Sequence, residues 1–172
     1  MIILISGSGI GAGKTTLAKI LRDKHNGFIL SFAYIAKEHL AAQFKNELFL
    51  SPRQEDKNIL IDGVSVRQHI INYCVEKKKN DPAFFARNMV QLIHESTSKY
   101  TTIIIDDMRY AVELHAIKKH FDYQGVRHIH VDNFLATPEP ETDEKLLRNQ
   151  ADMIYRWFLQ TELLVADGTT CS

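Results

Sequence analysis

The chain has 172 residues, of which 45% are hydrophobic and 24% are charged, a composition typical of one globular domain with a substantial core. Its 21 basic and 21 acidic residues give a formal net charge of zero, which excludes a general attraction to nucleic acid or to an anionic membrane. No stretch of the sequence approaches the ~20 apolar residues that a membrane-spanning helix requires, so we expect no membrane partner.

The first predicted element is a strand over residues 2–5, Ile-Ile-Leu-Ile, because four branched residues in a row indicate burial on both faces. Glycines in the stretch 6–13 then allow a turn so tight that consecutive backbone N–H groups point into one hollow. Apolar residues recur at helical spacing between Leu17 and Leu21, so a helix is predicted to start directly after the loop. Its free N–H groups and positive dipole end face the same hollow, which suits phosphate.

This strand, loop and helix carry a Walker A motif, G-x-x-x-x-G-K-[ST], with one departure, because Ser8 stands where the motif has its first glycine. The spacing allows Lys14 to reach the β- and γ-phosphates of a nucleoside triphosphate, and the Thr15 hydroxyl to ligate the accompanying magnesium. The residues predicted to bind the triphosphate are Gly9, Ile10, Gly11, Ala12, Gly13, Lys14, Thr15 and Thr16.

The rest of the chain alternates between predicted strands and helices. In chain order these are a strand over 28–32, helices over 33–44, 66–79 and 81–97, a strand over 101–107, a helix over 111–121, a strand over 126–131, a long helix over 146–158 and a fifth strand over 163–166. Residues 45–64 and 133–143 are interpreted as loops. This alternation predicts an α/β fold in which about five parallel strands form one sheet with helices on both faces, and ligands of such sheets bind outside the carboxyl ends of the strands.

Three local features have structural interpretations. Ser65 is placed to cap the helix over 66–79. Phe84 and Phe85 are assigned to the core rather than to stacking on a base. His128 and His130 lie two apart on a strand and share a face, and without a third ligand nearby we interpret them as a polar feature of the sheet edge rather than as a metal site.

Two carboxylates end the strand over 101–107. Asp106 and Asp107 follow Ile103-Ile104-Ile105 and resemble the end of a Walker B strand, where one carboxylate holds magnesium directly or through water. Successive side chains on a strand point to opposite faces, so alternation alone does not decide which of the two acids faces the metal. If Asp106 faces the nucleotide site, Asp107 points elsewhere, and we predict Asp106 together with Thr15 as the metal ligands. Arg109 follows directly, and its planar fork is suited to clamp an acceptor phosphate.

With these residues in place, the chain resembles the deoxynucleoside monophosphate kinases of bacteriophages, a branch of the P-loop kinase superfamily. Asp107 stands at the signature aspartate of that family, so Asp106 is the additional acid. Four segments carry the resemblance: the loop Gly9 to Thr16; Ser31-Phe32-Ala33-Tyr34-Ile35-Ala36-Lys37-Glu38, which is similar to an F-A-x-x-x-K-E stretch; Arg67-Gln68 with Asp81-Pro82-Ala83-Phe84-Phe85; and Asp106-Asp107-Met108-Arg109-Tyr110-Ala111-Val112-Glu113, which is similar to D-[VM]-R-[FY]-x-x-E.

The resemblance implies a three-layer P-loop kinase fold in one domain over residues 1–172, with acceptor-binding helices in about 33–97 and a short lid region in about 132–148. It implies transfer of the γ-phosphoryl group of ATP, with Mg²⁺, to a deoxynucleoside 5′-monophosphate. The residues expected to act in catalysis are Lys14, Arg109, Asp106 and Asp107, and those expected to bind the nucleotide acceptor are Lys37, Arg67, Arg87 and Arg109.

The sequence leaves several alternatives open. The lid arginine is Arg127, Arg148 or Arg156. A P-loop kinase of another acceptor, either a hydroxyl of a modified base in phage DNA or another small phosphorylated metabolite, is the second hypothesis, and only this one has a nucleic acid partner. A nucleotide-binding module without catalysis is the third. Whether the protein forms a homodimer is also open.

The sequence also bears on location. Met1 leads directly into the first strand without a basic and then apolar leader, so we expect no secretory signal. Cys74 and Cys171 are too few and too far apart for a disulfide framework or a zinc site. We therefore expect reduced thiols and a cytoplasmic protein, in the host cytoplasm if the protein is phage-encoded.

Overall fold

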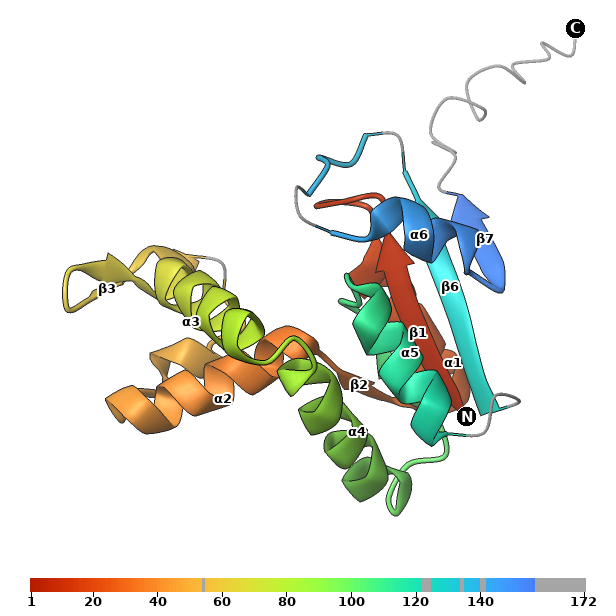
Figure 1. The fold of residues 1–172 in the computed structure, drawn as a ribbon, viewed down its shortest axis with the longest axis horizontal. Coiled ribbons are helices and arrows are strands. Elements are labelled where there is room, and N and C mark those ends of the chain that lie inside the picture. Colours follow the sequence, from red (N-terminus) through yellow and green to blue (C-terminus); the bar gives the residue numbers. More distant parts are fainter. Residues whose placement is uncertain (54, 122–124, 134, 140–141, 157–172) are drawn as a thin grey trace, which may run out of the picture.

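The computed structural model describes residues 1–53, 55–121, 125–133, 135–139 and 142–156. Its centre is a five-stranded sheet in the order β2-β5-β1-β6-β7, in which every pairing is parallel (Figure 1). The strands are β1 (Ile2–Gly7), β2 (Phe28–Leu30), β5 (Ile103–Ile105), β6 (Val126–Asp132) and β7 (Met153–Arg156). The predicted fold class, an α/β protein with a parallel sheet, is confirmed.

The central strand β1 is apolar on both faces because helices cover both sides of the sheet. On one face, Ile3 and Ile5 pack with Leu17 and Ala18 of α1 (Lys14–His25). On the other face, Leu4 belongs to a larger core to which α4 (Phe84–Thr97) and α5 (Ala111–His120) contribute. Burial of branched side chains at about 25 cal/mol per Å² is the main force that holds these layers together.

Helices α2 (Phe32–Phe44) and α3 (Val66–Asn80) lie beside the β2 end of the sheet and extend away from it (Figure 1). The Ser65 hydroxyl accepts a hydrogen bond from Gln68 N at 3.1 Å, which confirms the predicted cap of α3. Phe85 is buried and Phe84 is half-buried against the core, as predicted. Within the described part of the chain, no helix is both long enough and apolar enough to cross a membrane.

The loop predicted over 45–64 contains short ordered elements. These are the 3-10 helices η1 (Glu47–Leu50) and η2 (Glu55–Asn58) and the antiparallel strands β3 (Leu60–Ile61) and β4 (Val64–Ser65). Asp62 and Gly63 join the two strands, both with positive φ, the conformation that a tight hairpin turn requires. Such elements are too short to produce a periodic pattern in the sequence.

The predicted long helix over 146–158 is wrong. Helix α6 (Glu144–Asn149) ends early, and the chain continues as β7 at the edge of the sheet. Asp152 makes the change of direction: its N–H donates to His128 O at 2.9 Å and its carboxylate accepts from His128 N at 2.8 Å. A short apolar run fits a strand and a helix equally well, and pairing with β6 decided for the strand. The predicted strand over 163–166 lies outside the described residues.

Candidate active site at the carboxyl edge of the sheet

The loop after β1 turns through glycines into α1. Gly9, Gly11 and Gly13 have φ values of 143°, 82° and 97°, a region that other residues rarely adopt. The first-turn amides of α1, from Lys14 to Thr16, have no acceptor within their own helix and face the hollow of the loop. The loop therefore presents free donors at a helix N-terminus, the arrangement that suits a phosphate. Ile10 is an exception, because its amide donates to Thr137 O at 2.9 Å.

Ser8, the departure from the Walker motif, ties the loop to the end of β6. Its hydroxyl donates to Asn133 O and accepts from Asn133 N, both at 3.0 Å, and its amide donates to Val131 O at 3.0 Å. Glycine at this position could make only the last of these bonds. The departure from the motif thus adds two side-chain hydrogen bonds to the end of β6.

Lys14 lies over the loop with its side chain mostly buried. Its ammonium donates to Gly9 O at 2.7 Å and lies 3.7 Å from the carboxylate of Glu139. Burial lowers the pKa of Lys14, while the Glu139 carboxylate opposes that shift. A cation held in this position is suited to neutralise phosphate oxygens.

Thr15 and Asp106 meet at the predicted metal site. The Thr15 hydroxyl donates to Asp106 Oδ2 at 2.8 Å, although 91 positions separate the two residues in the sequence. Burial, and then the charge of Asp107, raise the pKa of Asp106 to about 6. A hydroxyl and a carboxylate are oxygen ligands of the kind that Mg²⁺ prefers, and Mg²⁺ commonly takes few protein ligands together with phosphate oxygens and water. The residues present therefore fit magnesium bound with a nucleotide.

Asp107 faces away from this pair, as the alternation along a strand predicts. Its carboxylate accepts from Phe32 N at 2.7 Å, from Ala33 N at 2.9 Å and from the Ser31 hydroxyl at 3.1 Å. These donors form the N-terminus of α2, so Asp107 anchors that helix to the end of β5. A direct catalytic contact, which we predicted for both acids, is thus supported by the geometry for Asp106 and not for Asp107.

Arg109 is positioned by the turn that leads into α5. The buried Glu113 carboxylate accepts from Arg109 N at 2.9 Å and from Tyr110 N at 3.0 Å, and burial raises its pKa to about 7. The Arg109 guanidinium then lies 2.7 Å from Glu139 Oε1. The Glu139 carboxylate contacts both Arg109 and Lys14, so these two cations are close enough to bind the same small anion.

Lys37 in α2 and Arg67 in α3 both act on a third cation, Lys57 in η2. Burial, and then the positive charges of Lys37 and Arg67, lower the pKa of Lys57. Lys57 is not among the residues predicted from the sequence, because it lies in a segment without periodicity. The residue before Lys57 shows that this loop is ordered. Asp56 is buried, and its carboxylate accepts a hydrogen bond from the Ser51 hydroxyl at 2.5 Å.

Arg87 is directed elsewhere. Its guanidinium forms a bidentate pair with Asp81 at the start of α4, with Arg87 Nη1 3.0 Å from Asp81 Oδ1. This exposed pair holds the pKa of Asp81 below its usual range. The structure therefore gives the predicted acceptor ligand Arg87 an ion-pair partner, Asp81, just before the first residue of its own helix.

The three candidate lid arginines occupy different places. Arg148 in α6 donates to Asp132 Oδ2 at 3.0 Å, at the end of β6 that lies next to the loop after β1. Arg127 pairs with Ile3 in the register of β6 and β1, so it lies toward the opposite edge of the sheet and is excluded as a lid residue. The backbone of Arg156 ends β7 opposite Asp132. Arg148 is thus the best placed of those whose side chain is described.

The interpretation of His128 and His130 as a sheet-edge feature is wrong. Both side chains are fully buried on the face of the sheet that carries Glu144 of α6 and Lys118 of α5, and β6 is not an edge strand, because β7 pairs with its outer side. They share a face, as predicted, and the Ser6 hydroxyl lies between them, 2.8 Å from His128 Nε2 and 2.9 Å from His130 Nδ1. Burial lowers the pKa of each to about 4, so both are neutral at pH 7. Among the described residues, no group of three potential metal ligands forms around them.

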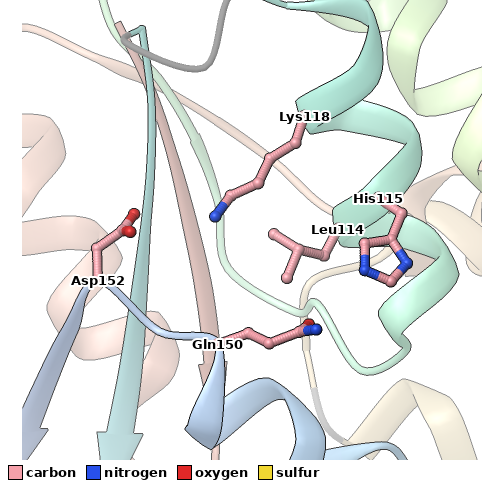
Figure 2. Close-up of a pocket in the computed structure, with 5 residues that line it drawn as sticks. All are labelled: Leu114, His115, Lys118, Gln150 and Asp152. Atoms are coloured by element: carbon pink, nitrogen blue, oxygen red, sulfur yellow. The ribbon is translucent and has the colours of Figure 1, made fainter.

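A cavity of about 220 Å³ lies on the α5 side of the sheet, apart from the loop. Figure 2 shows Leu114, His115 and Lys118 projecting from α5 on one side, with Gln150 and Asp152 on the other. None of these residues belongs to the predicted site. The carboxyl edge of the sheet, and not this cavity, therefore gathers the groups suited to phosphate chemistry.

Comparisons with known proteins add evidence on the fold. No protein-family model and no curated protein match the sequence. The crystal structure of TT1252 from Thermus thermophilus is similar to this chain with a TM-score of 0.53 at 17% identity, and the match covers 98% of each chain. A sugar kinase from Janibacter sp. matches with a TM-score of 0.46 at 13% identity, over 96% of this chain and 90% of that one. Shikimate kinase from Bacteroides thetaiotaomicron matches with a TM-score of 0.40 at 14% identity, over 91% of this chain and 86% of that one. At these identities the likeness concerns the fold alone.

Proposed function

We propose that this protein is a P-loop kinase that transfers the γ-phosphoryl group of ATP to a deoxynucleoside 5′-monophosphate. The observation that carries the proposal is the contact of 2.8 Å between the Thr15 hydroxyl and Asp106, beside the free amides at the start of α1. A helix N-terminus with a lysine above it suits a triphosphate tail, and the hydroxyl and carboxylate suit its metal.

Each group has a role that follows from its position. The amides from Gly13 to Thr16 bind phosphate oxygens, and the Lys14 ammonium neutralises charge on the β- and γ-phosphates. Thr15 and Asp106 would hold Mg²⁺, which supplies further charge neutralisation when bound. Phosphoryl transfer needs mainly positioning and neutralisation of charge, so no side chain has to form a covalent bond.

The acceptor side rests on two groups of cations. Arg109 and Lys14 both pair with the Glu139 carboxylate and are therefore close together. Arg109 is thus suited to hold the acceptor phosphate next to the transferred group. Lys37, Lys57 and Arg67 form a second positive region beside α2 and α3. The resemblance of the segments around Lys37 and Arg109 to the phage kinases supports a nucleotide as the acceptor.

A coupled assay of ADP release tests the proposal. Folded protein with ATP and Mg²⁺ is expected to turn over at least one of the four deoxynucleoside monophosphates. Lys14→Ala should lower kcat by about 10³-fold, as removal of a phosphate-neutralising cation does elsewhere. Lys19→Ala, an exposed position of the same helix, is the matched control and should retain wild-type activity.

The acceptors in the same assay separate the alternatives. Transfer of labelled phosphate to DNA polymer, with salt-sensitive affinity and no transfer to mononucleotides, would favour the kinase of a modified base. Transfer to another small phosphorylated metabolite would change the substrate and keep the mechanism. Tight ATP binding without transfer to any acceptor would leave a binding module and refute the proposal.

A further inference from the structure

Glu139 occupies the place between the two cations of the candidate site. One of its carboxylate oxygens lies 2.7 Å from Arg109 Nη1, and the other lies 3.7 Å from Lys14 Nζ. The side chain is only 11% exposed, although it belongs to the irregular segment after β6. A carboxylate in this position presents two anionic oxygens to the groups that a phosphate would need.

The backbone of the same segment is attached to the phosphate-binding loop. Ile10 and Thr137 exchange two hydrogen bonds of 2.9 Å, which form an antiparallel bridge between the loop and the segment. Gly9 makes this approach possible, because a Cβ at this position would lie 2.1 Å from Thr137 O. The bridge is two residues from Glu139, so the position of its carboxylate over Lys14 follows from the backbone contact.

A phosphate chain and the Glu139 carboxylate compete for the same donors. Lys14 and Arg109 each have a limited number of N–H groups. Two carboxylates, those of Asp106 and Glu139, already lie at this site, so the phosphates of a nucleotide bound beside the two cations would be a third negative group there. Like charges at such short range repel strongly in a partly buried site. Binding of the tail therefore requires the carboxylate to leave.

We propose that Glu139 is an internal competitor of phosphate, so that the contact between Glu139, Lys14 and Arg109 is autoinhibitory and lowers the affinity of the protein for nucleotide. The inference rests on the proposed function, because it concerns the same phosphate site. An intramolecular competitor reduces apparent affinity by the fraction of molecules in which the site is open. Removal of the carboxylate should raise that fraction.

Calorimetry with two probes tests this inference on the full chain. Mg²⁺–ATP and Mg²⁺–tripolyphosphate are titrated into wild type, Glu139→Gln and Glu139→Ala. Both variants are expected to bind both probes about tenfold more tightly than wild type, because the charged bridge is lost while Lys14 and Arg109 remain. Tripolyphosphate has no base, so an equal gain with both probes locates the effect at the phosphates.

Two matched variants separate the bridge from general charge effects. Glu95→Gln removes one carboxylate from the exposed end of α4 and should bind like wild type. Glu139→Asp keeps the charge but shortens the side chain by one methylene, so the carboxylate is too short for both cations and the variant should bind more tightly than wild type. An Asp variant that binds like wild type would assign the effect to charge alone and overturn the inference.

The remaining outcomes distinguish the two proposals. If wild type binds both probes and the Gln and Ala variants bind equally or more weakly, the autoinhibitory contact is refuted and the proposed function stands. If wild type and both variants bind neither probe, the nucleotide site itself is refuted. If wild type binds weakly and the variants bind well, both proposals are supported.

Discussion

Asp106 and Asp107 are neighbours in the sequence, and their carboxylates serve different parts of the molecule. Asp106 accepts a hydrogen bond from Thr15 at the start of α1, whereas Asp107 accepts from Phe32 N and Ala33 N at the start of α2. The end of β5 thus fixes the N-termini of two helices on its two sides. In the proposed function, the first contact belongs to the metal site and the second positions α2, one of the helices proposed to bind the acceptor.

The two aspartates should respond differently to the same substitution. Asp106→Asn is expected to lower kcat by about 10²-fold or more, with a weakened dependence on Mg²⁺, because an anionic metal ligand is lost. Asp107→Asn should lower the free energy of unfolding by about 1 kcal/mol, because it removes a negative charge from a helix N-terminus. Magnesium titration of activity and urea unfolding measure the two effects. Equal loss of magnesium dependence in both variants would contradict the division of roles.

Ser8 gives a prediction about the unusual loop. Ser8→Gly restores the Walker pattern but removes both side-chain bonds to Asn133, so the free energy of unfolding should fall by about 1–2 kcal/mol. The free energy of unfolding of Ser8→Ala should fall by a similar amount, and the nucleotide affinity of both variants should stay close to that of wild type. Urea unfolding with both variants provides the measurement. A Gly variant as stable as wild type would show that these bonds are exchanged for water without loss.

Gly9 and Gly11 form a matched pair for the contact between the loop and the segment after β6. Both have positive φ, so alanine brings backbone strain of roughly 1 kcal/mol at either position. A Cβ at Gly9 also meets Thr137 O at 2.1 Å, whereas a Cβ at Gly11 meets nothing within 4 Å. Gly9→Ala should therefore be clearly less stable than Gly11→Ala and should speed hydrogen exchange of the Thr137 amide. Similar stability of the two variants would contradict the close approach.

The acceptor-side cations should divide into two groups. Arg67→Gln and Lys57→Gln are expected to raise the KM for the acceptor about tenfold with little change in the KM for ATP, because both are proposed to face the acceptor and the charge of Arg67 acts on Lys57. Arg87→Gln should leave both values near wild type, since its guanidinium is paired with Asp81. Steady-state kinetics with each substrate varied in turn measure these effects. A larger effect at Arg87 than at Arg67 would show that the acceptor binds near the start of α4.

The buried histidines predict how stability depends on pH. Burial lowers the pKa of His128 and His130 to about 4, from an ordinary value of 6.5 in the unfolded chain. At these two side chains the unfolded state therefore binds more protons between these values, so their contribution to the free energy of unfolding falls as the pH drops from about 6.5 to about 4, by on the order of 3 kcal/mol per histidine. His128→Gln should reduce this dependence, and His25→Gln, at an exposed position in α1, should not. Urea unfolding of wild type and His128→Gln across this pH range isolates the histidine contribution, because the raised pKa values of Asp106 and Glu113 act in the opposite direction in both proteins. Identical pH profiles of the two proteins would refute the prediction.

The sequence determined the elements whose signal is local. The branched run of β1, the glycines before Lys14 and the periodic helices α1 to α5 could all be predicted, because burial, backbone freedom and helical spacing are properties of neighbouring residues. The order of strands and helices then implied one parallel sheet, and with it a common edge for the loop and for Asp106. The fold class was therefore within reach of the sequence, as was the meeting of Thr15 with Asp106.

Contacts between distant segments could not be predicted in this way. The short apolar run before Arg156 fits two structures, and only pairing with β6 made it a strand. The burial of His128 depends on what packs on its face of the sheet, and the pairing of Arg87 with Asp81 depends on a rotamer at a helix start.

Glu139 illustrates the limit most clearly. In the sequence it is one acid among prolines in a loop, and nothing nearby marks it. In the structure, the bridge between Ile10 and Thr137 brings it to Lys14 and Arg109. The sequence by itself thus determined where the groups proposed to bind phosphate lie along the chain. The tertiary structure alone decided which charges face them, because the interaction of two charges depends on their distance in space and not on their separation in the chain.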